Sequence, residues 1–192
     1  ISAALAGRQP DRTPVMLHNF MMAAREAGVT MHQYRSDARQ MARCHIEAVE
    51  KYGYDGMMID VDTATLAAAA GVPTEYPEDE PAVCRGVRLR SLEEVDDLAP
   101  VDLTSHEGVV MWLECVRLLK QYFGNEIYVR GNCDQAGFSL ACLMRGIEQW
   151  MLDIVDEDSR ERVERLLEYC TGVTMQFLRL MAETGCDMLS NG

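Results

Sequence analysis

Basic residues are scarce in this sequence of 192 residues: 18 lysines and arginines stand against 31 aspartates and glutamates, giving a net charge of −13. A chain this acidic repels phosphate backbones and anionic lipid headgroups, so nucleic-acid and membrane-surface binding are disfavoured. No uncharged apolar stretch approaches the roughly 20 residues that span a bilayer. No secretion signal opens the sequence. We therefore expect a cytoplasmic protein with neither a nucleic-acid nor a membrane partner.

Several diagnostic motifs are also absent. The sequence contains no G-x-G-x-x-G or P-loop pattern, no H-E-x-x-H pair and no G-x-S-x-G elbow, which disfavours common nucleotide-binding, metalloprotease and serine-hydrolase sites. The seven cysteines form no C-x-x-C pair and their number is odd, so we expect reduced thiols rather than a disulfide framework. No Cys/His cluster has metal-ligand spacing, so we expect no metal site within this chain.

The hydrophobic pattern predicts strands that alternate with helices. Short apolar runs indicate buried strands at 15–18, 56–60, 127–130 and 187–190. Capping residues, glycine stops and helical spacing indicate helices at 21–27, 36–52, 63–70, 105–123, 138–154 and 158–183. Ser91 with Glu94 reads as a capping box for a shorter helix ending near Pro100, and 75–90 as a loop or β-hairpin. No Gly/Ser linker divides the chain, so we expect one domain.

Continuously apolar strands between helices predict an α/β fold with a parallel sheet. This pattern fits an open doubly wound sheet or a (β/α) barrel. Because the nucleotide fingerprints typical of the open sheet are missing, we expect the barrel.

Polar residues follow each predicted strand, and barrel enzymes place their chemistry at the carboxyl ends of their strands. These residues are therefore predicted to form one polar rim around a cavity: His18, Asn19, Asp60, Asp62, Arg130, Asn132, Asp134, Ser190 and Asn191. Each has a simpler explanation. Asp62 and Asp134 could cap helices, Asn132 could be a turn residue, and Arg130 could pair with Asp60 or Asp134.

The remaining histidines are weaker candidates for a site. Cys44 and His45 are adjacent on a helix, so their side chains diverge, and core packing is the expected role. His32 and His106 are expected at the surface.

Several segments together resemble the uroporphyrinogen decarboxylase superfamily, over nearly the whole chain. They are 12–15 (RTPV), 54–62 (YDGMMIDVD) with Gly71 nine residues on, 131–140 (GNCDQAGFSL) and 184–190 (TGCDMLS), together with the excursion at 75–90 and the following SLEEVDDL. The resemblance implies a (β/α)8 barrel of the uroporphyrinogen decarboxylase type. It also implies one of two chemistries, which are cofactor-free decarboxylation of uroporphyrinogen or zinc-dependent methyl transfer involving a corrinoid or a thiol such as coenzyme M.

The resemblance assigns Asp62 to the catalytic aspartate, which hydrogen-bonds pyrrole nitrogens in the decarboxylases. The family's substrate-binding arginines, from an R-Q-A-G-R motif, are absent, because the matching positions 17–21 read Leu-His-Asn-Phe-Met, and the family's tyrosine falls on Leu143. Arginine bonds to carboxylates contribute about 1.5–3 kcal/mol each. A methyltransferase acting with a corrinoid protein or a thiol is therefore favoured over a decarboxylase of porphyrin biosynthesis.

In such methyltransferases the zinc ligands lie in the second half of the barrel. His18, Asn19, Asp62, Asn132 and Asp134 would then shape the pocket above them. A third interpretation is a noncatalytic module that binds a corrinoid or tetrapyrrole. Four strands are half of a (β/α)8 barrel, so we expect residues 1–192 to be the N-terminal half of a truncated domain. The sequence does not decide whether the protein forms a homodimer.

Overall fold

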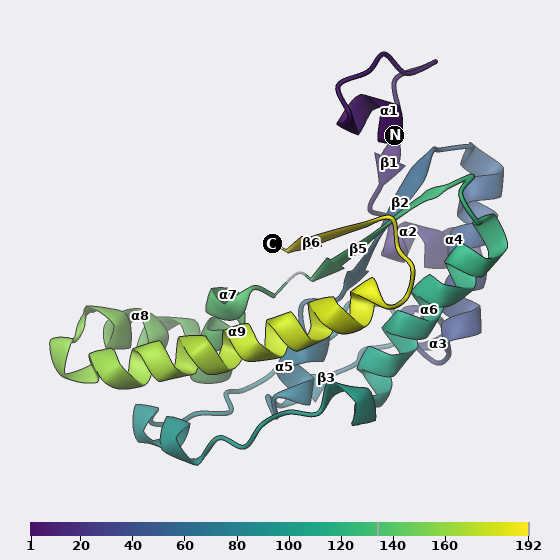
Figure 1. Cartoon of the computed structure of the whole chain (residues 1–192). Helices are drawn as coiled ribbons and strands as arrows, with labels where there is room; N and C mark the ends of the chain where they lie inside the picture. Colours follow the sequence, from purple (N-terminus) through teal and green to yellow (C-terminus); the bar gives the residue numbers. More distant parts are fainter. Residues whose placement is uncertain (134, 192) are drawn as a thin grey trace.

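The computed structural model describes residues 1–133 and 135–191, with the side chain of Val61 outside the description. A four-stranded parallel sheet has the order β1-β2-β5-β6 (Figure 1). Its strands are β1 (Met16–Leu17), β2 (Gly56–Val61), β5 (Tyr128–Cys133) and β6 (Met188–Asn191). The segment predicted as a loop or hairpin forms a small antiparallel sheet of β3 (Thr74–Glu75) and β4 (Val83–Cys84). The predicted α/β fold with a parallel sheet is confirmed.

The helices connect these strands. They are α1 (Ser2–Leu5), α2 (Phe20–Glu26), α3 (Met31–Tyr34), α4 (Ala38–Tyr52), α5 (Thr65–Ala69), α6 (Glu107–Phe123), α7 (Gly137–Arg145), α8 (Ile147–Val155) and α9 (Arg160–Ala182), with 3-10 turns η1 (Leu92–Asp97), η2 (Leu103–Ser105) and η3 (Glu157–Ser159). Asp37 caps α4, because its Oδ1 accepts a hydrogen bond from the Arg39 amide at 2.8 Å. Within the described part of the chain, no helix has the length and apolar character to cross a membrane.

Three local predictions were wrong. The helix predicted over 138–154 is two helices, because Gly146 has a φ of +85° that ends α7 and redirects the chain into α8. Helix α6 begins at Glu107 rather than at Ser105, with the His106 ring as its cap. The capping box at Ser91 does not form, since Glu94 accepts a 3.4 Å hydrogen bond from the Arg90 amide and η1 has no side-chain cap.

One face of the sheet carries the core. Figure 1 shows the long helices α4, α6 and α9 together on one side of the sheet. Met57, Ile59 and Val129 are fully buried, whereas the alternating residues Met58 and Arg130 are partly exposed. Because successive side chains of a strand point to opposite faces, the first set faces the helices and the second set faces away from them.

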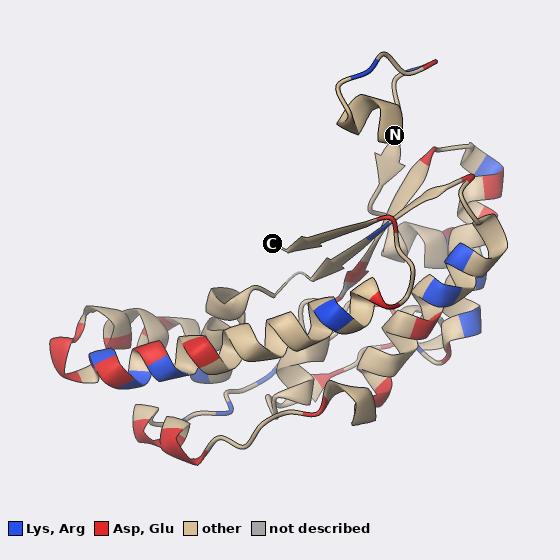
Figure 2. Cartoon of the chain, in the orientation of Figure 1, with Lys and Arg blue, Asp and Glu red and all other residues tan. Residues whose placement is uncertain are grey.

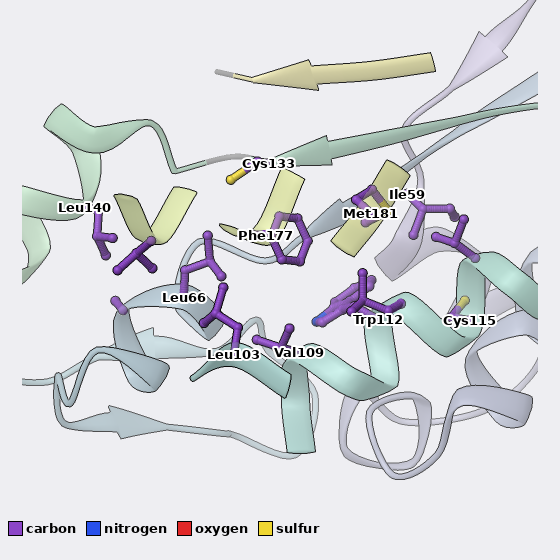
Figure 3. Close-up of a cluster of buried hydrophobic side chains, with 14 of the residues drawn as sticks. Ile59, Leu66, Leu103, Val109, Trp112, Cys115, Cys133, Leu140, Phe177 and Met181 are labelled. Atoms are coloured by element: carbon purple, nitrogen blue, oxygen red, sulfur yellow. The ribbon is translucent and has the colours of Figure 1, made fainter. Parts of the chain in front are cut away.

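The core joins the sheet to α6 and α9. Figure 3 shows Ile59 with Trp112 of α6 and with Phe177 and Met181 of α9, and all four belong to one buried cluster. Burying apolar surface at about 25 cal/mol per Å² supplies the main stabilising free energy of such a cluster. The helix-facing side of the sheet is therefore structural, and the opposite face is the one left for a site.

A test of this packing uses Gly131, in the middle of β5. A Cβ at this position would lie 2.5 Å from Met181 Cγ and 2.8 Å from its Sδ, on the helix-facing side. We expect Gly131→Ala to lower the free energy of unfolding by about 1–3 kcal/mol through overpacking, measured by urea denaturation.

The matched control is Gly172→Ala in α9, where an added Cβ meets no atom within 4 Å. Alanine favours a helix over glycine by about 1 kcal/mol, so this variant should be slightly more stable. Equal stability of the two variants would contradict the packing described.

Candidate functional site

The parallel register aligns polar residues of three neighbouring strands. Asp60 of β2 is the register partner of Asn132 in β5, which is in turn the partner of Ser190 in β6. Asn132 Nδ2 donates to Asp60 Oδ1 at 3.0 Å, and the Ser190 hydroxyl donates to Asn132 Oδ1. These three side chains lie on the face that the long helices leave uncovered.

Two further side chains extend this alignment at its ends. Arg130 Nε donates to Ser190 Oγ at 2.7 Å, and His18 Nε2 lies 3.6 Å from Asp60 Oδ2. We call His18, Asp60, Asn132, Ser190 and Arg130 the polar row. Arg130 donates to Ser190, Ser190 donates to Asn132, and Asn132 donates to the Asp60 carboxylate. Each hydrogen bond therefore fixes the orientation of the next side chain.

The polar row is partly shielded from water. Asp60 is 7% exposed and Asn132 is 6% exposed, so their hydrogen bonds form in surroundings where an unmade bond costs about 1–3 kcal/mol. Asn132 lies within β5, so the interpretation of it as a turn residue was wrong. Arg130 makes no ion pair with Asp60, and the strand-end prediction at Asp134 lies outside the described residues.

Asp62 belongs to a different part of the structure. Its Oδ1 accepts hydrogen bonds from the backbone amides of Ala64 (3.0 Å) and Thr65 (2.7 Å) and from the Thr65 hydroxyl (2.8 Å). The carboxylate therefore caps the start of α5, as the simpler interpretation held. Asp62 is 8% exposed, and among the described residues Oδ2 has no hydrogen-bond donor.

A cavity of about 960 Å³ lies beside Asp62, and none of the polar row lines it. Its walls come from α3, the first turns of α4 and α6, and the residues around β3; they include Arg35, Asp62, Tyr76, His106 and Trp112. The rim predicted around one cavity is therefore divided: the polar row occupies the open face of the sheet, and Asp62 faces a cavity next to the helix ends.

Burial and the charge of Asp62 shift the pKa values of groups that line this cavity. Burial, and then the Asp62 charge, raise the pKa of Tyr76. Burial lowers the pKa of Arg35, and the Asp62 charge opposes that shift. Burial also lowers the pKa of His106, which is half-buried on the wall of the cavity.

Asn19 and Asn191 stand apart from the polar row. Both side-chain polar atoms of Asn19 are buried and have no hydrogen-bond partner among the described residues. Asn191 ends β6 as the register partner of Cys133, and its side chain is exposed. Neither residue is tied into the hydrogen-bond network of the row.

Sequence reasoning missed the walls of the cavity. Arg35 donates to the Glu80 carbonyl at 2.8 Å and lies 5.7 Å from the centre of the Tyr76 ring. These residues lie in a short helix and in the β3–β4 excursion, far apart in the sequence and without a motif. Among the wall residues named above, Asp62 was predicted as a site residue, and His106 lies at the start of the helix predicted over 105–123.

His45 is a core residue, as predicted. Its Nε2 is 2.8 Å from the Tyr34 hydroxyl and its side chain is fully buried. Burial, and then the nearby charge of His18, lower the pKa of His45 to about 4. The imidazole is therefore neutral at physiological pH.

No metal centre is present in residues 1–133 and 135–191, where no group of three or more His, Cys, Asp or Glu residues could hold an ion. No disulfide bond joins any of the seven cysteines. The chemistry available from the polar row is binding and orientation by an imidazole, a carboxylate, an amide, a hydroxyl and one guanidinium.

Residues 1–191 match the family model of uroporphyrinogen decarboxylase (URO-D), and the chain therefore belongs to this family. It is 23% identical over 193 residues to the methylcobamide:CoM methyltransferase MtbA of Methanosarcina acetivorans, covering 97% of this chain and 55% of that protein. It is 25% identical over 206 residues to a uroporphyrinogen decarboxylase of Mycolicibacterium gilvum, covering 97% of this chain and 54% of that protein.

A solved structure of a methyltransferase from Methanosarcina mazei superposes with a TM-score of 0.84 at 17% identity, covering 97% of this chain and 56% of that one. A uroporphyrinogen decarboxylase of Mycobacterium ulcerans is 30% identical over 135 residues, covering 64% of this chain and 35% of that protein. The chain thus spans about half the length of the first two relatives. Members of the family are methyltransferases or decarboxylases.

The capping role of Asp62 can be tested by two variants. Asp62→Ala removes three accepted hydrogen bonds at the start of α5, and we expect it to lower the free energy of unfolding by about 1–2 kcal/mol. Asp62→Asn keeps an oxygen acceptor, so its free energy of unfolding should fall by less than that of Asp62→Ala. Urea denaturation measures both, and an alanine variant as stable as the wild type would rule out the cap.

The buried neutral His45 predicts a pH dependence of stability. Its pKa is about 4 in the folded protein, against an ordinary value of 6.5, so the unfolded chain binds a proton first as pH falls. Stability should therefore drop between pH 6.5 and about 4, by up to about 1.4 kcal/mol per pH unit from this group.

The comparison variant is His45→Gln, which cannot titrate. Urea denaturation at a series of pH values should give a shallower loss of stability for H45Q than for the wild type across this window. Parallel pH profiles for the two proteins would show that His45 is not held neutral in the fold.

Proposed function

We propose that the protein is a methyltransferase-type member of the URO-D family, which transfers a methyl group between a corrinoid carried by a protein and a thiol. In this proposal the four parallel strands are consecutive strands of a (β/α)8 barrel. The open face of the sheet then lines the barrel interior, and the polar row faces the substrates.

The observation that carries the proposal is the composition of the polar row. It holds one guanidinium, whereas a uroporphyrinogen carries eight carboxylates. The positions after β1 present His18 and Asn19, and His18 is engaged with the Asp60 carboxylate. A site with one cation suits a substrate with little negative charge, because each unpaired carboxylate brought out of water costs free energy.

The hydrogen bonds of Asp62 give independent support. Stabilising a protonated pyrrole intermediate requires carboxylate oxygens that can accept N–H bonds from the substrate. One oxygen of Asp62 already accepts three hydrogen bonds from the start of α5. Only Oδ2 is left to contact a ligand. This suits a residue that helps to bind a ligand in the cavity better than one that stabilises a protonated pyrrole by itself.

The zinc ion implied by the family resemblance does not fit the described residues, which contain no cluster of suitable ligands. If zinc takes part, the described residues alone do not supply its ligands. The part proposed for this chain is to bind and orient the thiol and the corrinoid protein.

Decarboxylation of uroporphyrinogen is the second candidate. It is favoured by the 30% identity to the Mycobacterium ulcerans decarboxylase over 135 residues. Asp62 would then be the catalytic residue, acting through the oxygen that α5 leaves free. We rank it second because the polar row offers a single arginine.

The deciding assay gives the purified protein methylcobalamin with a panel of thiols and, separately, uroporphyrinogen. We expect thioether formation that depends on the protein and no loss of carboxyl groups from uroporphyrinogen. Mass spectrometry of the products measures both reactions.

The control is the same assay with Asn132→Ala, which breaks the polar row between Asp60 and Ser190. Methyl transfer should fall by about tenfold or more, since removing one buried hydrogen-bond partner costs about 1–3 kcal/mol. Decarboxylation by the wild type at an enzymatic rate, with no methyl transfer, would overturn the proposal.

A further inference from the structure

Helix α8 exposes an apolar surface that neither the core nor the polar row uses. Ile147, Met151 and Val155 recur at a spacing of four residues along this helix, and Leu152 lies beside them. The exposed fractions of these four side chains run from 50% to 75%. Residues at this spacing form a ridge along one face of a helix. We call the four residues the α8 ridge.

The opposite face of α8 is packed against the rest of the protein. Trp150 is fully buried, and its ring centre lies 5.8 Å from that of Phe138 in α7. Asp153 pairs with Arg145 at 2.7 Å, and Arg145 also donates to the Arg90 carbonyl at 2.7 Å. Because these contacts fix the orientation of α8, the helix cannot rotate to bury its ridge.

The charges that border the ridge within α8 and at its carboxyl end are acidic. These exposed residues are Glu148, Asp156, Glu157 and Asp158. In the part of the chain that the structure describes, none of the four makes an ion pair, whereas in α9 Glu161 pairs with Arg165 and Glu164 with Arg160. Figure 2 shows the acidic residues at the turn from α8 into α9 and the nearby basic residues on α9. The ridge therefore lies beside negative charge that no arginine of this chain neutralises.

This charge argues against three kinds of occupant. Anionic lipid headgroups and nucleic acid are repelled by it. A second copy, with two α8 helices packed antiparallel about a two-fold axis, would bring Glu148 of one helix towards Asp156 and Glu157 of the other. Like charges placed together across an interface are unfavourable.

We propose that the α8 ridge is a docking surface for a basic protein partner, which presents an amphipathic helix with lysines or arginines beside its apolar stripe. Exposed apolar patches with a polar rim mark interaction sites. Helical partners bind such surfaces through apolar side chains spaced one turn apart, and complementary charge selects the partner. A ridge on a helix of nine residues suits a small, transient interface. The proposal is independent of methyl transfer, because it uses no residue of the polar row.

The test measures peptide binding to the full-length protein by fluorescence anisotropy. The first probe is a labelled helical peptide of about 15 residues, in which a stripe of leucines is flanked by lysines. The second peptide keeps the leucines and has glutamate in place of every lysine. We expect the lysine peptide to bind at least about tenfold more tightly at low salt, with the difference shrinking as salt screens the charges.

Two matched variants test the apolar contact. Met151→Ser and Met175→Ser each replace a methionine on an exposed helical face, with exposed fractions of 50% in α8 and 43% in α9. Met151→Ser should weaken binding of the lysine peptide by about tenfold, and Met175→Ser should leave it unchanged. Equal binding by the two variants would overturn the assignment of the ridge.

Two double variants test the charge. Glu148→Gln with Glu157→Gln removes two acidic residues that border the ridge, and Glu168→Gln with Glu183→Gln removes two exposed acidic residues further along the chain. Both change the net charge equally, but only the first should weaken binding of the lysine peptide, by about three- to tenfold. An equal loss in both would show general attraction to an acidic protein and would overturn the proposal.

Sedimentation without peptide distinguishes a second copy from a basic partner. We expect a sedimentation coefficient that Met151→Ser leaves unchanged. Self-association that Met151→Ser abolishes would assign the ridge to a second copy of the chain and overturn the proposal. Failure of the wild type to bind the lysine peptide would also overturn it, since the ridge would then be covered or inert.

Discussion

The parallel register between β2, β5 and β6 is the constraint on which the site depends. It makes Asp60 a neighbour of Asn132 and Asn132 a neighbour of Ser190, although these pairs are separated by 72 and 58 residues in the sequence. Because side chains alternate between faces, a shift of one strand by one residue would turn its member of the polar row into the helix layer. The buried contact of Gly131 with Met181 opposes such a shift, so the core that stabilises the fold also fixes the polar row.

The fold was largely predictable from the sequence because its signals are local. Continuous apolar runs indicated the four parallel strands, and the glycine at position 53 marked the end of α4 correctly. The failures came where tertiary contacts override local preference. Gly146 divides one predicted helix into two, and β5 continues through Asn132, because pairing with β2 and β6 supplies hydrogen bonds that turn propensities cannot anticipate.

The site was predictable in part, for a different reason. The rule that chemistry gathers at strand ends placed His18, Asp60, Asn132 and Arg130 on one surface, and the structure joins them through Ser190. The rule could not show that Asp62 lies apart from the polar row, because a carboxylate that caps a helix and one that binds a ligand look the same in a sequence. Hydrogen-bond direction along the polar row is also invisible in a sequence, since it depends on side-chain geometry.

In the proposed function, the polar row is the surface that binds the substrates, on the face of the sheet that the long helices leave uncovered. A crystal structure of the protein with 2-mercaptoethanesulfonate tests this claim most directly. We predict that the bound thiol contacts the polar row. A thiol bound in the Asp62 cavity, without contact to the polar row, would contradict this claim.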